Sequence, residues 1–398
     1  MMKSIDTRQK KQNVLLIYRK MIPSIRLCGH CQMEELASQG KVDYRAVQEM
    51  RITNADLNWA DIVLLGRLDS WYEYQLTKML HQSGRYLIYI IDDDLLNIPP
   101  EISSARYYGQ KEIQGYIRGM IEMSDAILSP SPLLLEKYAV DGRKAIQIEE
   151  PAIDPAPYKP HDPTKLVKIG FAGSIDRVSD VENILKEALL EIKQEYGDRV
   201  AIEFFGAIPS FADELDAKYI PYTDSYDDYR KTLNSLEWDI GLAPMPDTPF
   251  HACKHYNKFV EYAAAGIAGI YSNVSPYTRL SAFPGYAELC DNNTATWIVT
   301  TKKLIDQYSY REKIRKKSLY YAVDKLSLNQ SSEAFSREFF DHLGAPCTKH
   351  SSVHALLIYK LHNLVKRIIT HIQSRLGTKK QQVRTEPQDA KNCETNAS

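Results

Sequence analysis

Residues 238–244 read WDIGLAP, and residues 250–266 read FHACKHYNKFVEYAAAG. The first segment predicts a buried strand, and the second predicts a loop followed by a helix with small residues packed behind it. Lys254, Lys258 and Glu261 have the spacing i, i+4 and i+7, so they share one face of that helix or of the turn leading into it. The segment thus places two cations and a carboxylate just beyond the carboxyl end of a strand.

The region beyond the carboxyl end of a strand is where open α/β sheets bind ligands. Two cations there suit a diphosphate, and a carboxylate can accept hydrogen bonds from both hydroxyls of a ribose. A solvated helix face with one ion pair between Lys258 and Glu261 explains the spacing equally well. Spacing alone therefore leaves both a ligand site and a solvated face open.

A second candidate for a ligand-binding turn begins the same half of the chain. Residues 167–177 read VKIGFAGSIDR, which predicts a strand running into Gly173 and Ser174, with a helix starting near Ser179. Glycine lets the backbone approach a ligand closely, and free amides at a helix start favour an anion. Ser179 with Glu182 also has the pattern of a capping box, which needs no ligand.

Short apolar runs alternate with helical patterns along the chain, as is typical of parallel α/β domains. Four prolines within residues 154–163 predict an extended linker. We expect an N-terminal domain at 1–155, a linker at 156–165, a C-terminal domain at 166–330, and a terminal helix at 331–344 that could cross back. The predicted strands are 14–18, 62–65, 86–91, 126–129, 145–148, 167–172, 200–205, 240–243 and 267–271. The predicted helices are 32–39, 74–83, 112–123, 181–196, 225–236, 256–265 and 309–321.

The composition is that of an ordinary globular protein, with 44% hydrophobic and 25% charged residues in 398. Because 50 Lys and Arg face 51 Asp and Glu, the net charge of -1 gives no global attraction for nucleic acid. No stretch approaches the roughly 18 apolar residues of a membrane span, and the apolar run behind the basic N-terminus is too short for a secretion signal. We expect a cytoplasmic protein whose six cysteines are reduced.

The segment 345–398 differs in charge from the rest of the chain. It holds nine Lys or Arg and three acids, which gives it a charge of +6 against -7 for the remainder. Within it, apolar residues recur at helical spacing over 352–375, flanked by basic residues. Such an amphipathic helix could lie peripherally on the inner membrane face, or it could pack on the N-terminal domain or a second subunit.

Two further motifs admit more than one interpretation. Residues 28–31 read CGHC, which has the form of a redox dithiol, of half a zinc site, or of a coincidental pair in a loop. Residues 92–94 read DDD and close a predicted strand, where carboxylates could hold a divalent metal or line a ligand cleft without one. We favour the coincidental pair and the metal-free cleft.

The segments at 167–177 and 238–266 resemble the C-terminal domain of family 4-like (group 1) glycosyltransferases of the GT-B fold. The likeness rests on the Gly-Ser turn, an acidic helix start near Asp180, the strand at 239–244 and the helix at 258–266. Ser-Pro-Tyr at 275–277 and the Asp run at 92–94 with Ile98-Pro99 also fit. The resemblance implies an α/β chain of two Rossmann-like domains facing a cleft, to which the C-terminal amphipathic helix is added.

The resemblance also implies a nucleotide-sugar site between the domains. Glu261 matches the family glutamate that holds the ribose, and Lys254, Lys258 and Arg177 lie where the family places cations that bind the diphosphate. The family often has an earlier glutamate that touches the donor sugar, and here that position is Cys253. The expected site is completed by Gly173, Ser174 and Asn257.

The implied activity is transfer of a sugar from a nucleotide diphosphate-sugar to a hydroxyl of a glycan or lipid-linked acceptor. We expect a retaining, metal-independent reaction in cell-surface polysaccharide or glycolipid synthesis, with no cofactor besides the donor substrate and no nucleic-acid partner. No residue is singled out as the catalytic base. Two alternatives stay open: a non-catalytic GT-B scaffold, which Cys253 favours, and a sugar-nucleotide epimerase of the same fold.

Overall fold

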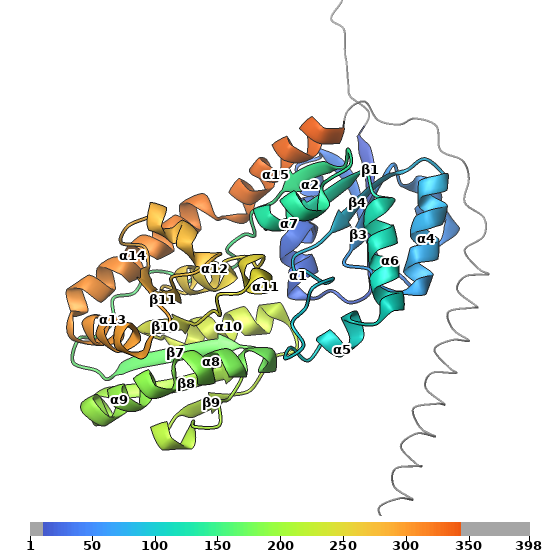
Figure 1. Ribbon diagram of the computed structural model, residues 1–398. Coiled ribbons are helices and arrows are strands. Elements are labelled where there is room, and N and C mark those ends of the chain that lie inside the picture. Colours follow the sequence, from blue (N-terminus) through green and yellow to red (C-terminus); the bar gives the residue numbers. More distant parts are fainter. Residues whose placement is uncertain (1–10, 344–398) are drawn as a thin grey trace, which may run out of the picture.

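The computed structural model describes residues 11–343, which form two α/β domains joined by an extended linker (Figure 1). Each domain contains a sheet of six parallel strands. The predicted fold class, two Rossmann-like domains, is confirmed for this part of the chain. The predicted helix at 352–375 and the rest of 345–398 lie outside the described residues, and the residue bounds given to the domains stay a prediction.

The first sheet has the strand order β2-β1-β3-β4-β5-β6. Alternate residues of its strands face two separate apolar clusters, one on each face of the sheet. One cluster is covered by α3, α4, α6 and α7, and the other by α2. The strands are β1 (Gln12–Tyr18), β2 (Val42–Gln48), β3 (Ile62–Gly66), β4 (Tyr86–Ile90), β5 (Ala126–Ser129) and β6 (Lys144–Gln147). The helices are α1 (Pro23–Ile25), α2 (Cys31–Ser38), α3 (Asn54–Trp59), α4 (Trp71–Gln82), α5 (Ala105–Tyr108), α6 (Lys111–Glu122) and α7 (Pro132–Tyr138).

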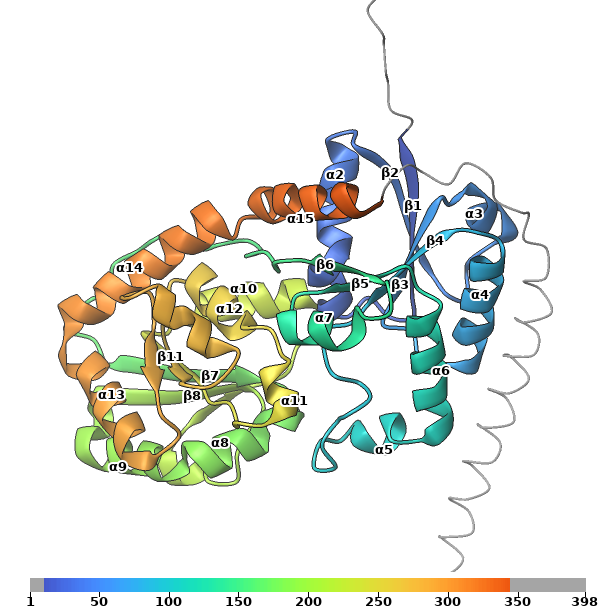
Figure 2. The same ribbon diagram turned by 45° about the horizontal axis from the view of Figure 1, so that its top comes forward.

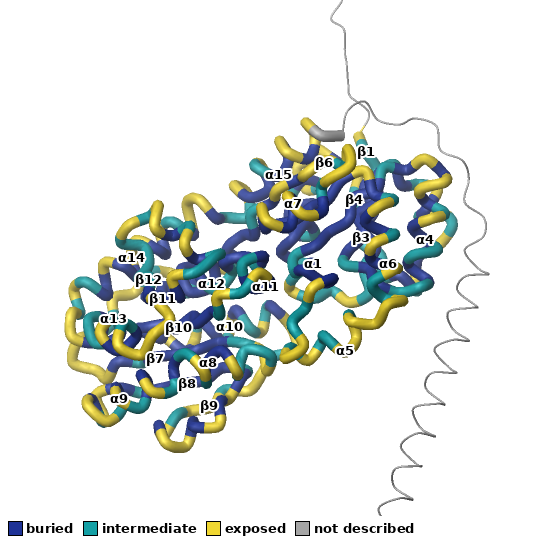
Figure 3. Tube along the Cα trace, in the orientation of Figure 1, coloured by how far each residue is buried: buried dark blue, intermediate teal, exposed yellow. Residues whose placement is uncertain are grey.

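The second sheet has the order β12-β11-β10-β7-β8-β9 and is likewise packed on both faces. Figure 3 shows the buried strands inside more exposed helices. The strands are β7 (Val167–Gly173), β8 (Val200–Gly206), β9 (Lys218–Ile220), β10 (Ile240–Ala243), β11 (Ala268–Ser272) and β12 (Glu288–Cys290). The helices are α8 (Val178–Ile184), α9 (Lys186–Tyr196), α10 (Tyr226–Leu236), α11 (Pro249–Ala252), α12 (Asn257–Ala264), α13 (Thr294–Asp306) and α14 (Tyr308–Lys325).

The last described helix, α15 (Leu328–Leu343), returns to the first domain. It follows α14 out of the second domain and lies beside α2 (Figure 2). Phe335 and Phe339 are buried in the cluster under α2 and the first sheet. The first domain thus takes part of its core from the far end of the described chain. No helix within residues 11–343 is long and apolar enough to cross a membrane.

The structure differs from the predicted elements in three edge strands that were not predicted, in one predicted helix that is divided in two, and in several helices that were missed, among them α3, α5, α7, α11 and α13. Strands β2, β9 and β12 were not predicted, because β2 alternates polar residues at a half-exposed edge and the other two have three residues each. The predicted helix at 181–196 is wrong as one element, since the chain kinks at Leu185 between α8 and α9. Helix α13 was missed because its sequence is rich in β-branched residues.

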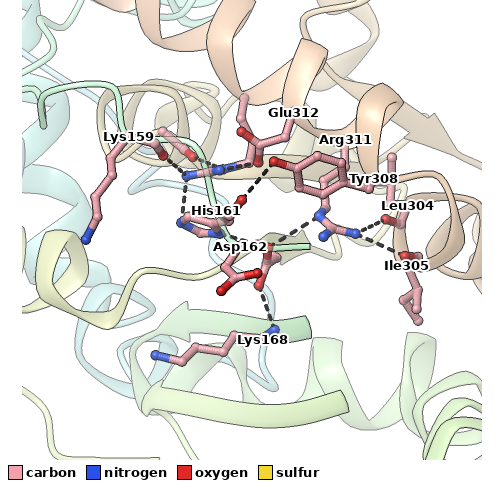
Figure 4. Close-up of polar contacts among 12 residues, drawn as sticks. Lys159, His161, Asp162, Lys168, Leu304, Ile305, Tyr308, Arg311 and Glu312 are labelled. Carbon is pink, nitrogen blue, oxygen red and sulfur yellow. Dashed lines mark hydrogen bonds and ion pairs between the residues drawn. The ribbon is translucent and has the colours of Figure 1, made fainter. Parts of the chain in front are cut away.

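The linker is fixed to the second domain by a buried polar network (Figure 4). His161 Nδ1 lies 2.8 Å from Asp239 Oδ1, and Asp239 Oδ2 accepts a hydrogen bond from the Lys168 amide at 2.9 Å. Arg315 Nη2 donates to His161 Nε2 at 2.7 Å, so the proton of a neutral imidazole is on Nδ1, facing Asp239. Burial alone would raise the pKa of Asp239, but the His161 hydrogen bond, the Lys168 amide and the charge of Arg311 lower it. These contacts therefore anchor the proline-rich linker to the second domain.

Candidate functional site

The carboxyl ends of both sheets meet at an interdomain cleft. Strand β7 leads to β8 on one side of the second sheet, whereas its neighbour β10 leads to β11 on the other side. A crevice opens where the connections diverge in this way, and ligands of open α/β sheets bind there. The segments that follow β1, β4 and β6 of the first sheet face the same place.

Two adjacent pockets occupy this region. The cleft pocket, about 260 Å³, lies between the domains, and the side pocket, about 180 Å³, lies against β8 and α10. Gly173, Ser174 and Lys258 line both. The other residues of the cleft pocket are Ser24, Asp92, Asp93, Glu150, Arg177, Met245, Lys254, His255, Asn257 and Tyr277. Those of the side pocket are Pro23, Phe205, Gly206, Tyr222, Thr223, Asp224, Ser225, Tyr226, Tyr229 and Glu261.

The Lys258–Glu261 ion pair is formed, as the solvated-face interpretation predicts, but it is largely buried, with side-chain exposures of 23% and 9%. Lys258 Nζ lies 2.6 Å from Glu261 Oε2, and Tyr229 donates its hydroxyl proton to the same oxygen at 2.7 Å. Burial and this carboxylate raise the pKa of Tyr229, which keeps its hydroxyl protonated. Arg230 Nη1 donates to the Glu261 carbonyl at 2.8 Å and holds the helix. Glu261 is only 8% exposed, and its carboxylate lines a pocket.

Lys254 crosses the cleft. Its Nζ lies 2.6 Å from Asp93 Oδ1 of the first domain, and Arg67 pairs with the same carboxylate at 3.3 Å. Burial alone would raise the pKa of Asp93, but the two cations lower it. Lys254 stands in the turn between α11 and α12, so only Lys258 and Glu261 belong to the helix itself.

Arg177 and the Gly-Ser turn lie at the end of β7. Arg177 Nε pairs with Asp180 at 2.8 Å, and Nη2 donates to the Pro244 carbonyl at 2.6 Å, so the residue joins the two strands that flank the crevice. The predicted capping box is wrong, because α8 begins at Val178 without a side-chain cap and Glu182 accepts from the Ser210 amide.

The structure brings all seven predicted site residues together around the two pockets, and their roles stay a prediction. Two residues of the cleft were missed. Glu150 follows β6 and is 1% exposed, and His255 stands 3.7 Å from it. Adjacent glutamates directly after a predicted strand, at the sheet edge where ligands bind, were the available signal.

The structure also locates three other features that the sequence singled out, namely Cys253, the CGHC motif at 28–31 and the Asp run at 92–94. Cys253 is 7% exposed and packs into the apolar cluster of the first domain, and it does not line the cleft pocket. Burial raises the pKa of Cys28 well above its usual value and that of Cys31 to about 12, the opposite of what a reactive dithiol needs. Asp92 and Asp93 line the cleft pocket, as the cleft interpretation predicts, and the carboxylates at 92–94 pair with Arg67, Lys254 and Lys137. Within residues 11–343 no group of three or more His, Cys, Asp or Glu could hold a metal ion.

Comparison with solved structures defines the class of fold. The chain is similar to a glycosyltransferase from Rickettsia africae, with 14% identity, a TM-score of 0.56, and coverage of 85% of this chain and 100% of that one. Anabaena Alr3699/HepE in complex with UDP and glucose gives 9% identity, a TM-score of 0.56, and coverage of 83% and 99%. A putative UDP-N-acetylglucosamine 2-epimerase from Listeria monocytogenes gives 13% identity, a TM-score of 0.51, and coverage of 84% of this chain and 98% of that one.

The architecture is therefore the GT-B fold, which glycosyltransferases and nucleotide-sugar epimerases share. No protein-family model matches the sequence, and no curated protein matches it significantly. Identities this low show the fold alone.

Proposed function

We propose that the chain is a glycosyltransferase that moves a sugar from a nucleoside diphosphate-sugar to a hydroxyl acceptor. The observation that carries the proposal is the meeting of the two pockets at Gly173, Ser174 and Lys258, at the switch point of the second sheet. One side of this junction offers a buried carboxylate, Glu261, and the other opens into the interdomain cleft. A GT-B neighbour solved with UDP and glucose supports this assignment.

The proposed donor lies across both pockets. The nucleoside occupies the side pocket with its ribose hydroxyls on Glu261, and the diphosphate lies at the shared junction beside Lys258. The sugar then enters the cleft pocket, where the first domain presents the acceptor. Lys258 stabilises the charge that develops on the departing diphosphate in a site largely shielded from water. The two domains align the acceptor hydroxyl with the anomeric carbon.

The nucleotide site is tested by calorimetry of the full chain with UDP, GDP, ADP and dTDP. At least one of them should bind, and Glu261→Ala should weaken its binding by about 1.5 to 3 kcal/mol, because two charge-assisted hydrogen bonds to the ribose are lost. Glu187→Ala, which removes an exposed glutamate on α9, is the matched control. Failure of all four nucleotides to bind at millimolar concentration would overturn the proposal.

Metal dependence is the second test. We expect transfer, or hydrolysis of the nucleotide sugar without an acceptor, to continue unchanged in EDTA, because the carboxylates at 92–94 are already paired with cations of the protein. An activity abolished by EDTA and restored by Mn²⁺ or Mg²⁺ would contradict this mechanism. Product analysis in the same assay distinguishes transfer from epimerisation of the sugar, the reaction that the Listeria neighbour's description names.

A further inference from the structure

Glu150 is a buried acid with an oxygen that the protein leaves without a partner. It is the third residue after β6, at the start of the connection between the domains, and it is 1% exposed. Glu150 lines the cleft pocket, and its buried Oε2 has no hydrogen-bond partner among residues 11–343. Burying a carboxyl oxygen without a partner is costly, so its retention points to a ligand that supplies the missing bond.

The one base close to Glu150 is committed elsewhere. His255 Nδ1 lies 3.7 Å from Glu150 Oε2, but it bonds to Asn257 Oδ1 at 2.5 Å, and Nε2 lies 3.1 Å from Glu149 Oε1. The imidazole is thus held by Glu149 and Asn257, and its ion pair with Glu150 Oε2 is too long to be a hydrogen bond. The Asn257 side chain also hydrogen-bonds the Glu150 carboxyl group, which leaves Oε2 as the oxygen without a hydrogen-bond partner among residues 11–343. The remaining charged or titratable groups that face Glu150 are Asp92, Glu261, Cys28, Cys31 and Tyr226.

The position of Glu150 relative to the shared junction identifies the ligand. A nucleoside diphosphate that fills the side pocket ends at Gly173, Ser174 and Lys258, which also border the cleft pocket. The group attached to the second phosphate must then lie in the cleft pocket. Glu150 lines this pocket from the side of the first domain.

We propose that Glu150 binds a hydroxyl of the sugar carried by the nucleotide donor, and this inference rests on the proposed function. Burial raises the pKa of Glu150 to about 7, although the charge of His255 lowers it, so the carboxyl is partly protonated near neutrality. A protonated carboxyl can donate one hydrogen bond and accept another, which matches a sugar hydroxyl. Glu150 is therefore a donor-sugar residue that comes from the first domain.

The test compares a nucleotide with its sugar ester in the same variants. Calorimetry measures the affinity for each nucleotide and for its sugar ester in the wild type, Glu150→Ala and Glu150→Gln, and the four pairs are UDP and UDP-glucose, GDP and GDP-mannose, ADP and ADP-glucose, and dTDP and dTDP-glucose. We expect Glu150→Ala to weaken binding of the nucleotide sugar about tenfold and to change binding of the nucleoside diphosphate less than about twofold, with a smaller loss for Glu150→Gln, whose amide still hydrogen-bonds. Thermal unfolding followed by circular dichroism verifies that each variant is folded.

Glu149→Gln is the matched control, because it removes the neighbouring carboxylate, which holds His255 but does not itself line the cleft pocket. It should leave the ratio of the two affinities unchanged. If Glu150→Ala weakens binding of the nucleotide and of the nucleotide sugar equally, the sugar contact is overturned and the proposed function stands. The same conclusion follows if Glu149→Gln changes the ratio of the two affinities as much as Glu150→Gln does. A wild type that binds none of the four nucleotides and none of their sugar esters overturns the proposed function itself, and the sugar contact with it.

Discussion

Replacement of Trp238 by alanine is expected to lower the free energy of unfolding by about 3 to 5 kcal/mol. Trp238 is fully buried two residues before β10, and its ring lies over Gly170 of β7, where an added Cβ would come within 2.0 Å of it. Its Nε1 donates to Glu203 Oε2 at 2.8 Å. The alanine variant therefore loses a large apolar contact, leaves a cavity and deprives a buried carboxylate of its hydrogen bond.

Urea unfolding followed by circular dichroism measures this loss, since the signal does not depend on the indole that is removed. Trp238→Phe should lower the free energy of unfolding by less, because a phenyl ring keeps much of the apolar contact although the hydrogen bond to Glu203 is broken. Gly170→Ala should destabilise the protein too, as the new methyl group collides with the Trp238 ring. A loss below about 1 kcal/mol for Trp238→Ala would contradict the packing described between β7 and β10.

Glu150→Gln is expected to stabilise the protein by about 3 kcal/mol at pH 8 and to have little effect near pH 4. The pKa of Glu150 is raised from 4.5 to about 7 in the folded protein, chiefly by burial. Between these values the folded state binds a proton that the unfolded state has lost. Stability therefore falls as the pH rises through this window, and the full penalty is present above pH 7. A neutral amide removes the penalty.

The measurement is the difference in unfolding free energy between Glu150→Gln and the wild type at pH values from 4 to 8. His255 also contributes to the pH dependence, because Glu150 and Glu149 raise its pKa against the effect of burial. The Glu149→Gln variant separates the contribution of His255 from that of Glu150. Its effect on the unfolding free energy has the opposite sign, because the Glu149 carboxylate stabilises the folded protein. Its hydrogen bond with His255 lowers the pKa of Glu149 to about 2 despite burial, so its stabilising effect is present above pH 4.5. If the difference in unfolding free energy between Glu150→Gln and the wild type does not change with pH, burial does not raise the pKa of the Glu150 carboxyl as described.

The donor-side elements could be predicted because they depend on local sequence. The apolar run at 240–243 and the helical spacing of Lys258 and Glu261 are properties of neighbouring residues, and the structure contains both β10 and α12. The same holds for the Gly-Ser turn after β7. Local periodicity and turn chemistry suffice for such features, since the side-chain direction follows from the backbone repeat.

The acceptor-side contacts could not be predicted in this way. Lys254 meets Asp93, 161 residues away in the sequence, and His255 meets Glu149, which is 106 residues away. Nothing in the local pattern distinguishes these partners from the other acids of the chain. Cys253 likewise joins the core of the domain to which it does not belong in sequence.

By itself, then, the sequence determined two parallel α/β units, an extended linker and the residue types at the carboxyl ends of β7 and β10. The tertiary structure alone decided which charges neutralise one another across the cleft, that the Lys258–Glu261 pair is shielded, and that Glu150 keeps an unpartnered oxygen toward a pocket. The physical reason is the separation along the chain of the residues that determine each feature. Strand and helix patterns arise from contacts within a few residues, whereas burial and charge pairing depend on how the two sheets are brought together by the linker and by α15.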